Sequence, residues 1–98
     1  MTFSTTSTRK VLDTKTAKRK YPEARIIVLD DNFNTFEHVA NCLVIIIPGM
    51  SKKISWDLTV KVDRQGFAEV WRGPLEQAEL YHQQLESKGL TMAPIEKT

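Results

Sequence analysis

The chain has one cysteine, four glycines and four prolines in 98 residues, and it lacks a long hydrophobic run. Cys42 has no second cysteine for an internal disulfide, which is typical of a reducing, cytosolic-type compartment. The longest apolar run, residues 42–47, is far shorter than the ~20 residues needed to cross a bilayer. The sequence therefore predicts no membrane partner, and we expect a cytoplasmic protein with one domain, since single cores usually take about 100–150 residues.

Residues for catalysis are also scarce. The two histidines, His38 and His82, have no cysteine or histidine at the spacing of metal ligands. No serine lies in the glycine pattern of a nucleophile elbow, and there is no glycine-rich loop for a phosphate. We predict no enzyme activity and no cofactor.

One segment opens like a calcium-binding loop. Asp30, Asn32 and Asn34 alternate as the first ligands of such a loop do. Thr35 stands where that loop needs glycine, however, and Asn41 stands where it needs a bidentate glutamate. We therefore predict no metal site.

Charge divides the chain into two parts. Residues 1–20 have six basic residues and one acidic residue, a net charge of +5. Residues 21–98 have eight basic and eleven acidic residues, a net charge of −3. The first part has few apolar groups, so we predict a flexible basic arm followed by one folded domain. Two alternatives remain open for the arm: an organelle transit peptide, which would place the protein in the plastid stroma, and a nucleic-acid-binding segment.

The first half of the domain has a clear pattern. Residues 24–29 are mostly β-branched and apolar, which predicts a buried strand. Apolar residues then recur at helical spacing up to Ile47, where Pro48 and Gly49 follow. Asn34 and Glu37 have the spacing of an N-cap and its capping-box partner, so we expect the helix to begin after Asn34.

The second half repeats helix and strand signals. Residues 51–62 have apolar Ile54, Leu58 and Val62 at helical spacing, and residues 67–71 alternate as a strand does. A turn is expected at residues 64–66 between them.

The C-terminal part predicts a third helix and a last strand. Gly73 and Pro74 form a helix start, and Gly89 is placed to end that helix in a left-handed conformation. Residues 90–95 follow as a short edge strand that contains Pro94. The predicted order is β-α-α-β-α-β, an α+β fold in which a three-stranded antiparallel sheet packs against three helices.

Acceptor side chains crowd the end of the first strand. Asp30, Asp31, Asn32 and Asn34 follow it directly. Carboxylate and amide oxygens are suited to bind a cationic donor through charge-assisted hydrogen bonds. The alternative is simple turn chemistry, because Asp and Asn side chains also bond their own backbone.

In this region the sequence resembles the ClpS adaptor family. The family has an aliphatic strand followed by Asn-Asp-Asp-aromatic-Thr-Pro-Met-Glu, where residues 29–39 here read LDDNFNTFEHV. Its Val-His-x-x-Gly motif is matched by residues 62–66, VDRQG, and its Ala-Glu-Thr-Lys helix by residues 78–81, AELY. The resemblance covers residues 21–98 in element order.

The resemblance implies an adaptor that binds the first residue of a substrate protein and passes it to a Clp AAA+ ATPase of the ClpC or ClpA type. By position, it implies an α-amino site at Asp30, Asp31 and Asp63, and a side-chain pocket at Phe36, Thr59, Val62 and Thr91. It also implies loop support by Asn32, Asn34 and Thr35, and docking on the N-terminal domain of the ATPase by Glu76, Glu79 and Tyr81. We expect a monomer.

Two departures from the family concern the α-amino site. Asp30 replaces the family's Asn and Asp63 replaces its His, so three carboxylates would face one ammonium. Phe36 and Thr59 would also reshape the pocket, and we expect a changed preference for the first residue, away from bulky aromatics. Such divergence resembles the second ClpS type of cyanobacteria. The alternatives are a ClpS-like regulator that does not bind N-termini and a small nucleic-acid-binding module.

Overall fold

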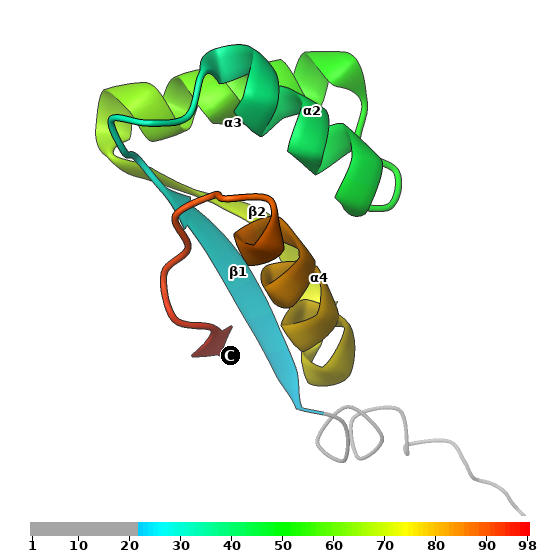
Figure 1. Cartoon of the computed structure of the whole chain (residues 1–98). Coiled ribbons are helices and arrows are strands. Elements are labelled where there is room, and N and C mark those ends of the chain that lie inside the picture. Colours follow the sequence, from blue (N-terminus) through cyan, green and yellow to red (C-terminus); the bar gives the residue numbers. More distant parts are fainter. Residues whose placement is uncertain (1–21) are drawn as a thin grey trace, which may run out of the picture.

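The computed structural model describes residues 22–98, so the predicted arm at residues 1–20 lies outside the described residues (Figure 1). The elements are β1 (Glu23–Leu29), α2 (Phe36–Ile46), α3 (Lys52–Gln65), β2 (Phe67–Pro74), α4 (Leu75–Ser87) and β3 (Glu96–Lys97). The three strands form an antiparallel sheet in the order β2-β1-β3. The predicted α+β fold and its element order are confirmed. Within residues 22–98, no helix has the length and apolar character of a membrane span.

Strand β1 is the centre of the molecule. Ala24, Ile26, Ile27 and Val28 are at most 5% exposed. Helix α4 lies along one face of the sheet, while α2 and α3 pack together across the end where β1 finishes (Figure 1). The loop after β1 therefore lies where the sheet, the α2–α3 pair and the segment after α4 meet.

Helix α2 begins one residue later than the capping pattern predicts. Thr35 is the N-cap, and its Oγ1 accepts a hydrogen bond from the His38 backbone N at 3.1 Å. The prediction for Asn34 was wrong because its side-chain amide is used elsewhere: Nδ2 donates to Asp31 Oδ2 at 2.7 Å and to the Gly89 carbonyl at 3.0 Å.

Helix α3 buries a face that its apolar pattern does not show. Ser55, Thr59 and Val62 are buried, whereas Ile54 is 51% exposed. The two hydroxyls can be buried because each donates to a backbone carbonyl of its own helix, Ser55 to Lys52 at 2.9 Å and Thr59 to Ser55 at 2.8 Å. The helix continues through the expected turn to Gln65.

Strand β2 is longer than predicted and continues to Pro74. The predicted helix start at Gly73 was therefore wrong, because Gly73 lies within the strand. A Cβ at this position would collide with the Trp71 ring, so the indole occupies the space that a side chain would need. Pro74 is the N-cap of α4, without a side-chain hydrogen bond, and Leu75 is the first helical residue.

The end of α4 agrees with the sequence, but the last strand does not. Gly89 has φ of +92°, as a left-handed cap requires. The predicted strand at residues 90–95 was wrong: Val28 and Met92 form an isolated bridge, and β3 comes only at Glu96–Lys97. Pro94 lacks the N–H that a continuous ladder needs, so the pairing with β1 is interrupted there.

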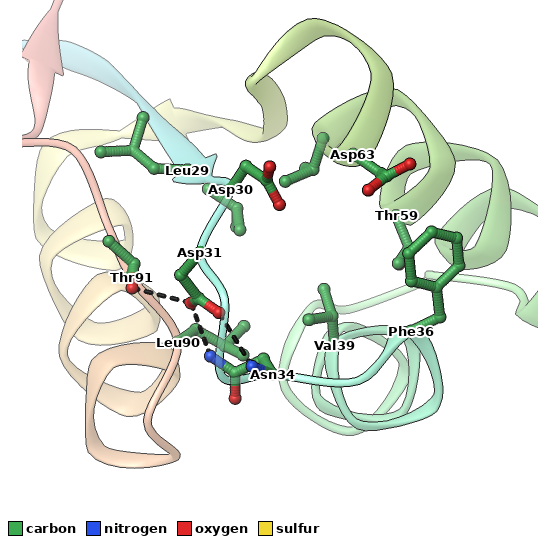
Figure 2. Close-up of a pocket in the computed structure, with 12 residues that line it drawn as sticks. Leu29, Asp30, Asp31, Asn34, Phe36, Val39, Thr59, Asp63, Leu90 and Thr91 are labelled. Atoms are coloured by element: carbon green, nitrogen blue, oxygen red, sulfur yellow. Dashed lines mark hydrogen bonds between the residues drawn. The ribbon is translucent and has the colours of Figure 1, made fainter.

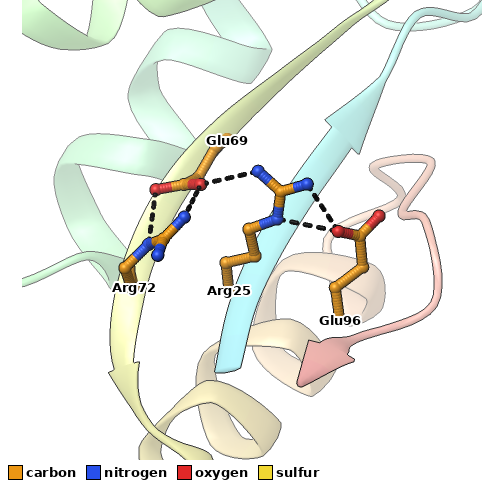
Figure 3. Close-up of polar contacts among 4 residues, drawn as sticks. All are labelled: Arg25, Glu69, Arg72 and Glu96. Atoms are coloured by element: carbon orange, nitrogen blue, oxygen red, sulfur yellow. Dashed lines mark hydrogen bonds and ion pairs between the residues drawn. The ribbon is translucent and has the colours of Figure 1, made fainter. Parts of the chain in front are cut away.

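The other face of the sheet carries a chain of ion pairs (Figure 3). The Arg25 guanidinium contacts Glu69 at 3.1 Å and Glu96 at 2.6 Å, and Arg72 contacts Glu69 at 3.0 Å. These four side chains, from β1, β2 and β3, form what we call the arginine network. Each of its carboxylates has an arginine partner.

Candidate functional site

A hollow opens at the end of β1, between the loop before α2, helix α3 and the segment after α4 (Figure 2). The space free of protein atoms in and in front of it amounts to about 320 Å³, part of which is open solvent. Among residues 22–98, twelve line it: Val28, Leu29, Asp30, Asp31, Asn34, Phe36, Val39, Thr59, Val62, Asp63, Leu90 and Thr91. Three of these are acidic and none is basic, so the hollow presents negative charge on a partly apolar wall.

Asp31 fixes the loop that forms one side of the hollow. Its Oδ1 accepts hydrogen bonds from the backbone N of Phe33 and Asn34, at 2.9 and 2.8 Å. Its Oδ2 accepts from Asn34 Nδ2 at 2.7 Å and from Thr91 Oγ1 at 2.8 Å (Figure 2). Four donors match the acceptor capacity of a carboxylate. Both oxygens are thus engaged within the protein itself.

The same hydrogen bonds keep Asp31 ionised. The backbone N–H of Asn34 is the main cause that lowers the pKa of Asp31 far below its ordinary value, and Phe33, Thr91 and the Asn34 side chain add to it. Burial opposes the shift without cancelling it. The folded loop therefore depends on the charged form of Asp31.

Asp30 and Asp63 differ from Asp31, because their carboxylates are not engaged by the loop. Both are exposed, and neither carboxylate has a hydrogen bond or ion pair with another side chain or backbone group of residues 22–98. Asp30 is the first residue after β1 and Asp63 lies in the last turn of α3, and both line the hollow (Figure 2). Their oxygens are available to a ligand with positive charge.

The apolar part of the hollow comes mainly from α2 and α3. Thr59 and Val62 on α3 are 3% and 5% exposed, and Val39 lies opposite them on α2. The half-buried Phe36 ring packs edge-on against Trp56, with ring centroids 5.6 Å apart. The Phe36 ring thus contacts α3 at the side of the hollow.

The structure brings most of the predicted site residues together. Asp30, Asp31 and Asp63 line the hollow with all four predicted pocket residues, Phe36, Thr59, Val62 and Thr91, and with Asn34. Thr35 supports the loop as the cap of α2, and Asn32 is exposed outside the lining.

Four lining residues were not predicted as site residues: Val28, Leu29, Val39 and Leu90. Val39 lies three positions after Phe36 on one helix, so helical spacing contained a signal for it. For Leu90 the sequence contained no such signal, because its position at the hollow depends on how the segment after α4 returns to β1. The Thr91 carbonyl accepts from Leu29 N at 2.8 Å, which brings that segment to the hollow.

The predicted docking residues lie on α4. Glu76 and Glu79 are exposed. Tyr81 is half-buried and packs edge-on against Trp71, with ring centroids 5.0 Å apart. The two glutamates are accessible to a partner. Much of the Tyr81 ring, in contrast, is buried where α4 packs on the sheet.

The cysteine and the two histidines are buried or hydrogen-bonded within the fold. Cys42 is 4% exposed, and burial raises the pKa of its thiol, which disfavours the reactive thiolate. The imidazoles of His38 and His82 bond to the carbonyls of Lys88 and Ala93, each at 2.8 Å. Among residues 22–98, no three metal-binding side chains cluster.

The chain folds into a small α+β domain whose surface has a hollow lined by acidic and apolar residues. A family model described as ATP-dependent Clp protease adaptor protein ClpS matches residues 19–93. The chain is 57% identical over 84 residues to the ATP-dependent Clp protease adapter protein ClpS of Synechocystis sp., covering 86% of each chain. It is 58% identical over 82 residues to the protein of that name from Nostoc sp., covering 84% of each. The chain belongs to the ClpS family of Clp protease adaptors.

Relatives within the cyanobacteria diverge widely. The ClpS protein of Synechococcus elongatus is 29% identical over 79 residues, which cover 81% of this chain and 83% of that protein. The sequence identity to this chain thus falls by about half from one cyanobacterial ClpS protein to another. Assignment to the second cyanobacterial type stays a prediction.

Proposed function

We propose that this adaptor binds the first residue of substrate proteins in the hollow and delivers them to a Clp AAA+ chaperone of the ClpC or ClpA type. One observation carries the proposal: carboxylates without a partner among the described residues lie at the rim, directly beside a buried apolar wall. A protein's first residue has the matching parts, an α-ammonium next to a side chain.

In this proposal the three acids divide the work. Asp30 and Asp63 accept hydrogen bonds from the α-ammonium, because their oxygens have no other partner among the described residues. Asp31 holds the loop in the receptive shape and adds negative charge, since its oxygens already accept four hydrogen bonds. The first side chain enters between Val39, Val62 and Thr59.

The test is fluorescence anisotropy with labelled peptides that share one sequence after the first residue. We expect binding with a free N-terminus and loss of binding on acetylation, because acetylation removes the charge and two donors. Acetylated and free peptides that bind equally would contradict the proposal.

The same panel tests the preference for the first residue. The Phe36 ring, which packs against Trp56, and the buried Thr59 both line the apolar part of the hollow, so each takes up space that a first side chain would use. We propose that compact aliphatic first residues bind better than Phe or Tyr. Undiminished tight binding of the Phe and Tyr peptides would contradict this preference while leaving N-terminal recognition intact.

For delivery, we propose that α4 docks on the N-terminal domain of the chaperone through the exposed Glu76 and Glu79. Charge reversal of both residues is expected to stop degradation of a reporter substrate and to leave peptide binding unchanged. We further propose that residues 1–20 act on the chaperone. Their deletion is expected to impair degradation without weakening peptide binding, and equal loss of both would contradict that role.

A second candidate is a regulator of the Clp ATPase that does not bind N-termini. The observation that favours it is the presence of three carboxylates around one hollow, whose mutual repulsion opposes the empty site. A folded protein that binds no peptide but still changes the ATPase rate would support this candidate. We propose the cytoplasm for either activity, which the cyanobacterial sources of the relatives support.

A further inference from the structure

A second concave surface lies between α2 and α3 and shares no lining residue with the hollow after β1. The space free of protein atoms in and in front of it amounts to about 430 Å³, part of which is open solvent. We call this surface the α2–α3 groove. It is lined by Glu37, Ala40, Asn41 and Val44 of α2 and by Lys52, Ser55 and Trp56 of α3.

Apolar side chains are exposed in and beside the α2–α3 groove. Trp56 is 42% exposed, and Ile45 is 74% exposed. Ile45 is four positions after Asn41 on α2, so these two side chains are neighbours and Ile45 stands at the edge of the groove. Inside the groove, Ala40 and Ser55 are small and buried. An exposed branched side chain thus lies next to a recess with small residues at its base, which is typical of a contact surface.

The groove also has one charge of each sign. Glu37 is in the first turn of α2, and Lys52 is the first residue of α3. Because only residues 47–51 join the two helices, α3 begins beside the end of α2, and the two charges are at opposite ends of the groove. Neither forms an ion pair with another residue of the described part of the chain.

This arrangement is complementary to itself. A two-fold axis through the middle of the groove exchanges its two ends, so Glu37 of one copy faces Lys52 of the other. The same ion pair then forms twice, as in any isologous contact. Two copies facing each other at this surface therefore bring together opposite charges at both ends and apolar side chains between them.

We propose that the α2–α3 groove is the interface of a dimer of this chain. In the dimer, Ile45 of each copy enters the groove of the other above Ala40 and Ser55, while Glu37 pairs with Lys52 across the two-fold axis. The dimer replaces the monomer that the sequence led us to expect. It does not depend on what the hollow after β1 binds, so the peptide experiments and the dimer experiments can fail separately.

The first test is sedimentation velocity on the full chain at concentrations from about 1 μM to about 1 mM, where weak complexes dissociate. The contact is small, so we expect a mass that rises from one chain to two as the concentration increases, with a Kd in the micromolar range. The mass of a single chain at every concentration would overturn the proposal.

Charge exchange assigns the dimer to the groove. Glu37→Lys alone and Lys52→Glu alone each place like charges opposite each other at both ends, so each is expected to weaken the dimer about tenfold or more. The double variant restores opposite charges with their places exchanged, and it is expected to dimerise again. Lys61→Glu is the matched control, because Lys61 is an exposed base of α3 outside the groove, and it should leave the dimer unchanged. A double variant that dimerises as weakly as the single variants would contradict the proposed pairing.

Ile45→Ser gives an independent test that does not alter a helix terminus. The residue is mostly exposed, so the variant is expected to fold, which circular dichroism checks. We expect it to lose the dimer, because each of the two copies then lacks the apolar side chain that enters its partner's groove. A folded Ile45→Ser protein that dimerises as tightly as the parent would show that the two copies meet at another surface and would overturn the inference.

Discussion

The two acidic regions of this molecule differ in what their carboxylates contact. On the open face of the sheet, Glu69 and Glu96 both pair with arginines of the same chain (Figure 3). At the hollow, no lysine or arginine of the described part of the chain, residues 22–98, is among the lining residues beside Asp30 and Asp63 (Figure 2). Charges that stabilise a fold are usually paired within it, whereas unpaired charges gathered at a concave surface suit a ligand.

Asp31 combines both kinds of environment. It lies in the hollow, but both of its oxygens are engaged within the chain, by four donors, as both oxygens of Glu69 are by three in the arginine network. An acidic residue that lines the hollow is therefore not necessarily one that contacts a ligand. The number of its hydrogen bonds within the chain is the better guide, and mutation can test it.

The largest effect is expected for Asp31→Ala. It leaves two backbone N–H groups and two side-chain donors without their acceptor, so we expect the free energy of unfolding to fall by about 2–3 kcal/mol. Peptide binding should be lost as well, because the loop is no longer held. Urea denaturation and anisotropy measure the two effects. Asn32→Ala, at the exposed neighbour, is the control and should change neither by much.

Asp30→Asn combined with Asp63→Asn should separate binding from stability. Loss of charge-assisted hydrogen bonds to the α-ammonium is expected to weaken peptide binding about 10- to 100-fold. The free energy of unfolding should stay within about 0.5 kcal/mol of the parent value, as is usual for surface positions. A large loss of stability would show that the two acids are structural and would remove the contrast with Asp31.

The pH dependence of stability gives a smaller effect with a defined sign. Hydrogen bonds lower the pKa of Asp31 in the folded state, so its contribution is fully present above its unfolded pKa of about 4. It is lost progressively as the pH falls toward the lower folded value. The difference in stability between the parent and Asp31→Asn should therefore be constant from pH 7 to 5 and decrease below about pH 4. A difference that does not change with pH would contradict the anchoring role.

The sequence predicted this fold well because its signals were local. The β-branched run of β1, the stop at Pro48 and Gly49, and the left-handed Gly89 each act through neighbouring residues. Errors occurred where a side chain had a distant partner. Asn34 was expected to cap α2, and its amide instead reaches the Gly89 carbonyl, 55 residues away in the sequence.

The site was predictable to a similar degree and for a related reason. The resemblance to a family placed Asp30, Asp63 and Thr59 in one site, and all three line the same hollow in the structure. It did not separate Asp31 from the other two acids, because the hydrogen bonds from Thr91 and the loop exist only in the folded chain. Composition shows how many acids a site has, and only the fold shows which of them are already satisfied.

The smallest effect is expected in the arginine network, with Glu69→Gln. Hydrogen bonds from Arg72, then those from Arg25, lower the pKa of Glu69 against the opposing effect of burial. These side chains are one third to one half exposed, so solvent screens their attraction. We expect a loss of about 0.5–1 kcal/mol in the free energy of unfolding, decreasing with added salt, and no change in peptide binding. Because Glu69 lies on the opposite face of the sheet from α4, altered peptide binding in this variant would mean that the two acidic regions communicate through β1.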